Sequence, residues 1–138
     1  MKPVAFTMLT SALLGVCAIA QDSQSTSQAE AAASAWLALV DAGRYSDSWE
    51  QAAGLFKSKI DAPSWASAIG GVRAPLGALR SRQIQSSTFT HTLPGVPDGN
   101  YVVIKYNSRF ENKAGALETV TPMQEKDGTW HVSGYFVK

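Results

Sequence analysis

Cysteine and histidine are scarce in this sequence. Among 138 residues, Cys17 is the only cysteine, and His91 and His131 are the only histidines. A zinc site built from cysteine, or from cysteine and histidine, is therefore excluded, and a site of several histidines has no support. A disulfide framework is also impossible, so the fold must be held together by its core.

Sequence signatures of common nucleotide-binding and esterase sites are also missing. The chain has no GxxxxGK[ST] phosphate-binding loop and no GxSxG nucleophile elbow. Its 12 basic and 11 acidic residues give a formal net charge of +1. A nucleic-acid-binding protein needs an excess of Lys and Arg to neutralise phosphates. The sequence thus predicts no metal, no cofactor and no nucleic-acid partner.

The N-terminal segment predicts export. Residues 1–20 have a basic start, an apolar stretch and the ending Ala18-Ile19-Ala20, which suits a signal peptidase that cuts after Ala20. The mature protein would be periplasmic or secreted, without stable membrane insertion. One alternative is an uncleaved anchor, although the apolar stretch is shorter than the roughly 20 residues of a typical span. Another is a lipoprotein acylated at Cys17, although Val16 is larger than the residue that usually precedes such a cysteine.

The rest of the chain predicts a short polar segment followed by one domain. Residues 21–28 are polar and are expected to form a flexible lead-in to a domain over residues 29–138. Apolar residues first recur every three or four positions, which predicts amphipathic helices. Asp61 is the expected N-cap of the last of these helices, and Pro75 is expected to break it near residue 74. The predicted helices cover about residues 29–42, 47–59 and 62–74.

Beyond Arg80 the hydrophobic pattern has a period of two, which predicts strands. Turn-forming sequences separate them, and Asp127-Gly128 is the strongest hairpin signal. Helices followed by hairpin-linked strands predict an α+β fold, with N-terminal helices packed on one face of a C-terminal antiparallel four-stranded meander. The predicted strands cover about residues 83–93, 101–110, 116–126 and 129–137.

Five stretches of this sequence resemble the bacterial family called domain of unknown function 4019. The resemblance extends over nearly the whole chain from about residue 29. It implies an exported protein with a helical front half and a curved sheet, similar in outline to the nuclear-transport-factor-2-like and cystatin-like cone. It implies no activity and no catalytic residues, because the family has none assigned. The matching stretches are RAPLG (73–77), PGVPDGNY (94–101), FENK (110–113), ETVTP (118–122) and DGTWHVSGY (127–135).

Aromatic side chains occur on both the predicted helices and the predicted strands. Two interpretations stay open: a solid core between helices and sheet, or a concave sheet whose mouth is an apolar pocket. For such a pocket the ligand-binding candidates are Trp49, Tyr106, Trp130 and His131.

Basic residues form a second candidate group. Arg73, Arg82 and Arg109 are candidates to surround an anionic ligand. The alternative is that they pair with nearby glutamates in ordinary ion pairs on a solvated face.

These patterns favour a non-enzymatic exported module that binds a protein, an envelope component or a small molecule. The alternative is a small enzyme that performs acid-base chemistry on an apolar ligand, with His131, Asp41 or Glu118 as its ionisable group. A third possibility is self-association through the edge of the last strand. On that strand His131, Ser133 and Tyr135 are expected to share a face, because side chains two apart point the same way. No catalytic residue is assigned.

Overall fold

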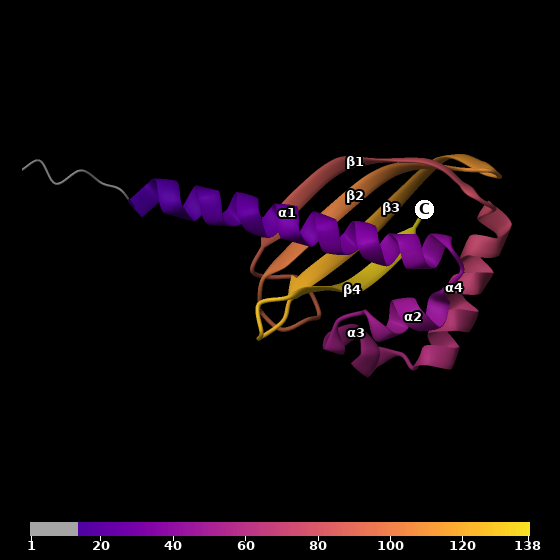
Figure 1. The fold of residues 1–138 in the computed structure, drawn as a ribbon, viewed down its shortest axis with the longest axis horizontal. Coiled ribbons are helices and arrows are strands. Elements are labelled where there is room, and N and C mark those ends of the chain that lie inside the picture. Colours follow the sequence, from indigo (N-terminus) through magenta and orange to yellow (C-terminus); the bar gives the residue numbers. More distant parts are fainter. Residues whose placement is uncertain (1–13) are drawn as a thin grey trace, which may run out of the picture.

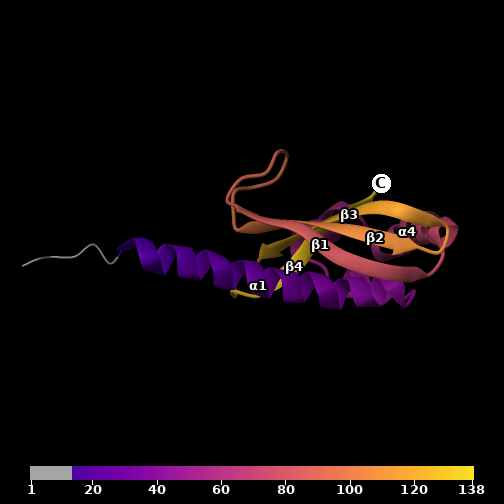
Figure 2. The same cartoon turned by 90° about the horizontal axis from the view of Figure 1, so that it is seen from above.

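The computed structural model describes residues 14–138, with side chains from residue 21 onward. Helix α1 (Leu14–Asp41) lies across one face of the sheet, and its N-terminal part projects beyond the sheet (Figures 1 and 2). The predicted signal peptide, residues 1–20, lies outside the residues whose side chains are described. Among the described residues, no helix combines the length and the apolar character that a membrane span requires.

Helix α1 carries the predicted apolar stripe but begins earlier than predicted. Residues 21–28, expected to be a flexible lead-in, continue the helix with mostly exposed side chains. No glycine or proline occurs between Gly15 and Gly43. The helical turns that pack on the sheet therefore extend toward the N-terminus without a helix-breaking residue. The stripe that packs on the sheet is fully buried and consists of Ala29, Ala33, Trp36, Leu37 and Val40.

The predicted second helix is in fact two short helices, α2 (Tyr45–Glu50) and α3 (Gly54–Lys59). Between them the backbone N–H of Ala53 donates to the carbonyl of Val132, 2.8 Å away. The chain therefore leaves the helical path to bond the sheet. This contact joins residues far apart in the sequence, so the apolar spacing could not reveal it.

Helix α4 (Ala62–Leu76) begins as predicted, because the Asp61 carboxylate caps it by accepting from the N–H of Ser64 at 2.8 Å. It continues past the predicted break near residue 74 and contains Pro75 in its last turn. Asn112 explains this end: its backbone N–H donates to the Leu76 carbonyl and its side-chain amide to the Pro75 carbonyl. Those carbonyls are therefore satisfied from outside the helix.

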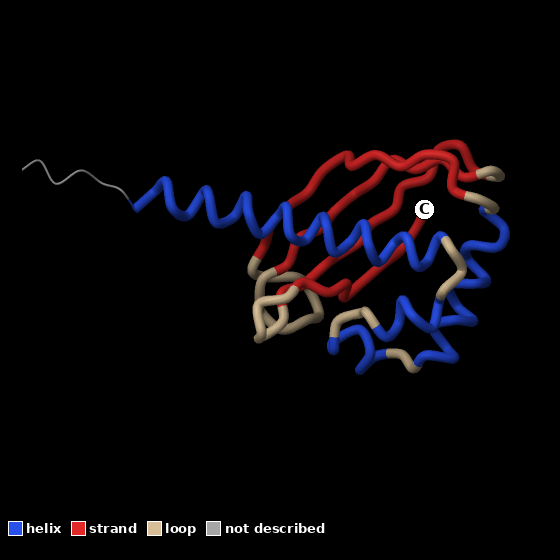
Figure 3. Tube along the Cα trace, viewed as in Figure 1, coloured by secondary structure: helices blue, strands red, loops and turns tan. Residues whose placement is uncertain are grey.

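The strands form the predicted antiparallel meander in the order β1-β2-β3-β4. Helices and strands are segregated along the chain, with the helices N-terminal (Figure 3). On β2 the side chains alternate between buried and exposed, as the sequence predicts. The α+β fold class is therefore confirmed. The strands are β1 (Leu79–Thr90), β2 (Tyr101–Phe110), β3 (Lys113–Gln124) and β4 (Trp130–Val137).

Aromatic side chains from the helices pack together in the core. The ring centroids of Trp36 and Trp65 are 5.8 Å apart, and those of Phe56 and Trp65 are 4.8 Å apart. Val102 and Ile104 of β2, both fully buried, belong to the same cluster. The interior between helices and sheet is thus packed with side chains.

The register of β4 changes at Ser133. Thr121 is opposite Gly134 and Pro122 is opposite Val132, which leaves Ser133 as an extra residue. Pro122 has no N–H to donate to the ladder, and bulges accommodate such positions. Beyond the bulge the alternation is inverted, so Tyr135 packs on the core. The prediction that it shares a face with His131 is wrong.

Candidate functional site

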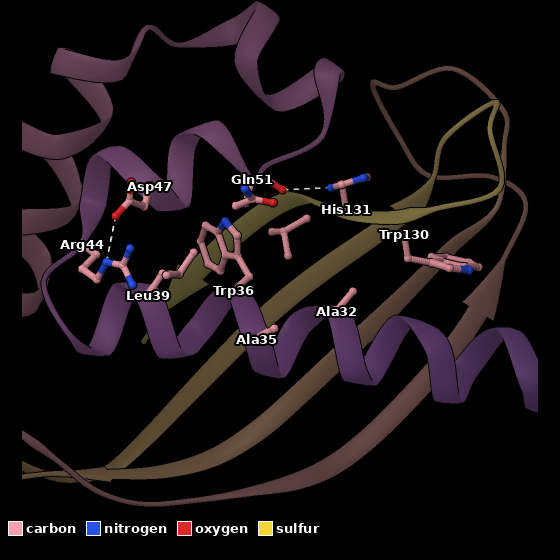
Figure 4. A pocket seen from close by; sticks show the side chains of 10 residues that line it. Ala32, Ala35, Trp36, Leu39, Arg44, Asp47, Gln51, Trp130 and His131 are labelled. Atoms are coloured by element: carbon pink, nitrogen blue, oxygen red, sulfur yellow. Dashed lines mark hydrogen bonds and ion pairs between the residues drawn. The ribbon is translucent and has the colours of Figure 1, made fainter.

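A surface hollow of about 450 Å³ lies between α1, α2 and β4, and we call it the α1–α2 groove (Figure 4). Its floor is apolar, since Trp36 and Val132 are only 2% and 1% exposed and belong to the core. On the α1 side the lining includes Ala32 and Ala35, whose small side chains leave space. A concavity of this size with an apolar floor is typical of small-ligand sites.

The helical period explains why α1 presents this surface. Ala32, Ala35 and Leu39 are spaced by three and four residues, so they form one flank of the helix beside the buried stripe. The opposite flank is held to β1, where the Ser87 hydroxyl donates to the Glu30 carboxylate at 2.7 Å. One flank of α1 is therefore bonded to the sheet, while the other lines the groove.

Polar side chains occupy the two ends of the groove (Figure 4). At one end Arg44 Nε donates to Asp47 Oδ2 at 2.8 Å, and both side chains are more than half exposed. At the other end His131 Nδ1 lies 3.0 Å from the backbone carbonyl of Gln51. Because a carbonyl only accepts, Nδ1 carries the hydrogen. His131 Nε2 lies 3.0 Å from the Thr129 hydroxyl, so both ring nitrogens are engaged.

The structure places two of the four predicted ligand-binding residues in this groove. Trp130 and His131 line it. Trp49 instead donates from Nε1 to the carbonyl of Ile60 at 2.8 Å. Tyr106 is buried in the core, and this burial raises its pKa to about 12. These two side chains are therefore packing residues here.

Sequence reasoning missed the groove's polar residues Arg44, Asp47 and Gln51, and it missed the side chains that α1 contributes, namely Ala32, Ala35 and Leu39. Alanine and leucine carry no chemical signature, so a search for reactive or aromatic side chains passes over them. For the three residues on α1, the available signal was their position on the helical wheel, beside Trp36 but off the buried stripe.

A second group of polar residues surrounds Glu118, which is 0% exposed. Its Oε1 accepts from Arg82 Nε at 2.7 Å and from the Ser108 hydroxyl at 2.5 Å. Its Oε2 accepts from Arg82 Nη2 at 3.1 Å and from the Tyr135 hydroxyl at 2.5 Å. The carboxylate is thus fully satisfied by donors from three strands, as a buried charge requires.

Asp41 at the end of α1 extends this network. It accepts from Arg82 Nη1 at 2.7 Å and from Arg73 Nη2 of α4 at 2.8 Å. Arg73 is 6% exposed and its guanidinium lies 4.8 Å from the centroid of the Phe110 ring. The four charged residues, which we call the buried ion cluster, therefore join α1, α4, β1 and β3. They are Asp41, Arg73, Arg82 and Glu118.

Contacts within the cluster favour the charged forms of Asp41 and Arg82. Burial alone would raise the pKa of Asp41, but the hydrogen bonds from Arg82 and Arg73 hold it below its usual value. For Arg82, burial opposes the charge, yet the contacts with Asp41 and Glu118 raise its pKa. Burial, together with the adjacent Glu118 carboxylate, raises the pKa of the Tyr135 hydroxyl.

The structure brings together two of the three predicted anion-binding residues. Arg73 and Arg82 meet at Asp41, a carboxylate of the same chain. Arg109 is exposed on the other face of β2, away from the buried side chains. Two arginines therefore face two internal carboxylates, and the charges within the cluster balance. Within the described part of the chain, no group of His, Cys, Asp or Glu side chains is arranged to hold a metal ion.

Comparison with known protein families gave a match that covers most of the chain. The family described as "Protein of unknown function (DUF4019)" matches residues 32–135. Comparisons with curated proteins and with solved structures gave no match. The matched segment contains all residues of the α1–α2 groove and of the buried ion cluster.

Proposed function

Because the chain belongs to the DUF4019 family, whose description names no activity, we propose a function from the geometry of the site. The protein is a non-enzymatic binding module that holds a small apolar molecule in the α1–α2 groove. The observation that carries this proposal is the hollow of about 450 Å³ with its floor of Trp36 and Val132. Burial of apolar ligand surface against that floor supplies the affinity, at about 25 cal/mol per Å² before the costs of binding.

The contacts of the ionisable candidates support binding rather than catalysis. A catalytic acid or base needs an ionisable atom within reach of a substrate. Asp41 and Glu118 are engaged by arginines of the buried ion cluster. His131 does line the groove, but both of its ring nitrogens already contact protein atoms.

The proposal includes export of the module to the periplasm or out of the cell. Its support is the pattern of residues 1–20, with a basic start, an apolar stretch and small residues before the expected cut. Mass spectrometry of the protein from the host's cytoplasmic and extracytoplasmic fractions tests this part. An N-terminus at Gln21 is expected, whereas an intact Met1 in the cytoplasm would contradict export.

Filling the groove tests the binding proposal. Ala35 is exposed and lines the groove, so Ala35→Phe places a ring in the hollow without removing any core contact. Ala38→Phe is the matched control, because Ala38 is also exposed on α1 but lies outside the groove lining. Both variants carry the same helix-propensity cost.

The measurement is a titration of the purified protein with octanol, followed by amide chemical shifts in NMR. In the wild-type protein and in Ala38→Phe, octanol is expected to shift the amides of residues 32–39 and 130–132. Ala35→Phe is expected to abolish those shifts. Shifts of equal size in all three proteins, or shifts elsewhere only, would contradict the proposal.

A further inference from the structure

The charges around the α1–α2 groove point to a more specific ligand class. Resting on the groove as the ligand site, we propose that the natural ligand is a small apolar carboxylate whose anionic group binds Arg44. The apolar part of this ligand lies against Leu39 and on the floor formed by Trp36 and Val132.

Arg44 has hydrogen-bonding capacity that its protein contacts do not use. Only its Nε is engaged, by Asp47 Oδ2 at 2.8 Å. Among the residues that the structure describes, none accepts a hydrogen bond from Nη1 or Nη2 of Arg44. Figure 4 shows this end of the guanidinium turned toward Leu39 and Trp36, along the groove. A carboxylate is the group that pairs with two such N–H donors side by side.

The rest of the groove lining fits an alkyl or aromatic body. Beyond Arg44 and Asp47, the lining side chains are alanine, leucine, valine and tryptophan, together with Gln51 and the engaged His131. Between Ala32 and Leu39 the helix rises by about 10 Å, which is room for a medium-length chain. Apolar burial at the floor and a charge contact at one end together describe an amphipathic anion.

The charges favour a free molecule over the surface of an anionic bilayer. The N-terminal part of α1 projects beyond the sheet, and residues 21–28 contain Asp22 but no lysine or arginine. An anionic membrane surface attracts basic segments and not acidic ones. Arg44 is also paired with Asp47, so the charge around it is small, which suits one small anion better than a charged surface.

Three probes with one chain length and different head groups test the ligand class: octanoate, octanol and octylammonium. The expected order of affinity for the wild-type protein is octanoate, octanol, octylammonium, with octanoate about three- to fivefold tighter than octanol, as for an exposed charge contact. Arg44→Gln is expected to remove this preference. Asp47→Asn is expected to increase it, because the competing carboxylate is gone.

The two variants control for each other. Both break the exposed Arg44–Asp47 pair, so loss of that pair alone would move the octanoate-to-octanol ratio in the same direction. Opposite changes therefore support the charge assignment, and parallel changes overturn it.

Equal binding of octanoate and octanol, with both blocked by Ala35→Phe, would overturn the carboxylate while keeping the groove. If no probe binds, or if Ala35→Phe has no effect, the groove itself is refuted. Sedimentation with phosphatidylglycerol vesicles without octanoate binding would overturn the free ligand.

Discussion

Replacing Glu118 with glutamine examines what the buried ion cluster contributes to the fold. The carboxylate accepts four hydrogen bonds, two of them from Arg82 and one each from Ser108 and Tyr135. A glutamine amide has the same shape but only one acceptor atom, and its NH2 group would face a guanidinium that can only donate. The substitution therefore leaves Arg82 partly unpaired in a site where its side chain is 14% exposed.

The expected cost is about 3 kcal/mol. Breaking a buried ion pair by removing one partner costs about 3 to 5 kcal/mol. The lower end applies because Arg82 keeps two hydrogen bonds to Asp41. Glu111→Gln is the matched control, since the Glu111 side chain is about half exposed and its Oε2 lies 4.0 Å from Nη2 of Arg80. An exposed pair of this kind contributes up to about 1 kcal/mol.

Urea unfolding followed by circular dichroism at neutral pH gives both values. The m-value must be unchanged, so that a lower midpoint reports a change in the free energy of unfolding. The reasoning is refuted if Glu118→Gln loses less than about 1 kcal/mol, or no more than Glu111→Gln. Either result would mean that the buried contacts around Glu118 are replaced without cost.

Three further outcomes follow from the same structure. Trp130→Ala removes a core ring and should lower the free energy of unfolding by about 3 to 5 kcal/mol in urea; a loss under 1 kcal/mol would remove Trp130 from the core. The pKa of Asp41 is lower in the folded protein than in the unfolded chain, where it is about 4, so Asp41 contributes stability above about pH 4. This contribution is lost as the pH falls through the pKa of Asp41 in the folded protein. Urea midpoints between neutral and acidic pH should therefore fall less steeply for Asp41→Asn, and equal slopes would contradict this. The raised pKa values of Tyr106 and Tyr135 contribute stability that is fully present below about pH 10, and for Tyr106 this contribution is lost as the pH rises through about 12. Tyrosinate absorbance of these two residues should therefore appear together with unfolding. Their titration in a protein that stays folded would contradict this expectation.

Local signals in the sequence predicted most of the elements. The Asp61 cap and the buried stripe around Trp36 depend on residues within a few positions of one another, so they could be identified without the fold. The split between α2 and α3 and the bulge at Ser133 could not. Both depend on partners elsewhere in the chain, namely Val132 for Ala53 and Pro122 for the bulge.

The buried ion cluster shows the same limit for charged residues. Asp41 and Glu118 were candidates for acid-base chemistry, and Arg73 and Arg82 were candidates for binding an external anion. Each was identified by its residue type, but the partner of each depends on how the sheet and helices assemble. The cluster unites residues 32 to 41 positions apart, a separation that composition and spacing do not constrain.

Helix α1 connects the two sites, because each lies on one of its flanks. Asp41 and Glu30 bond the first flank to β1 and α4, while Ala35 and Leu39 on the second flank line the groove. The position of α1 over the sheet sets the width of the groove, and the first flank supplies directional contacts that fix this position. Apolar packing of the buried stripe alone is non-directional. The cluster therefore fixes the orientation of α1 over the sheet through contacts among its own side chains, and Nε and Nη1 of Arg73 stay buried there without a hydrogen-bond partner.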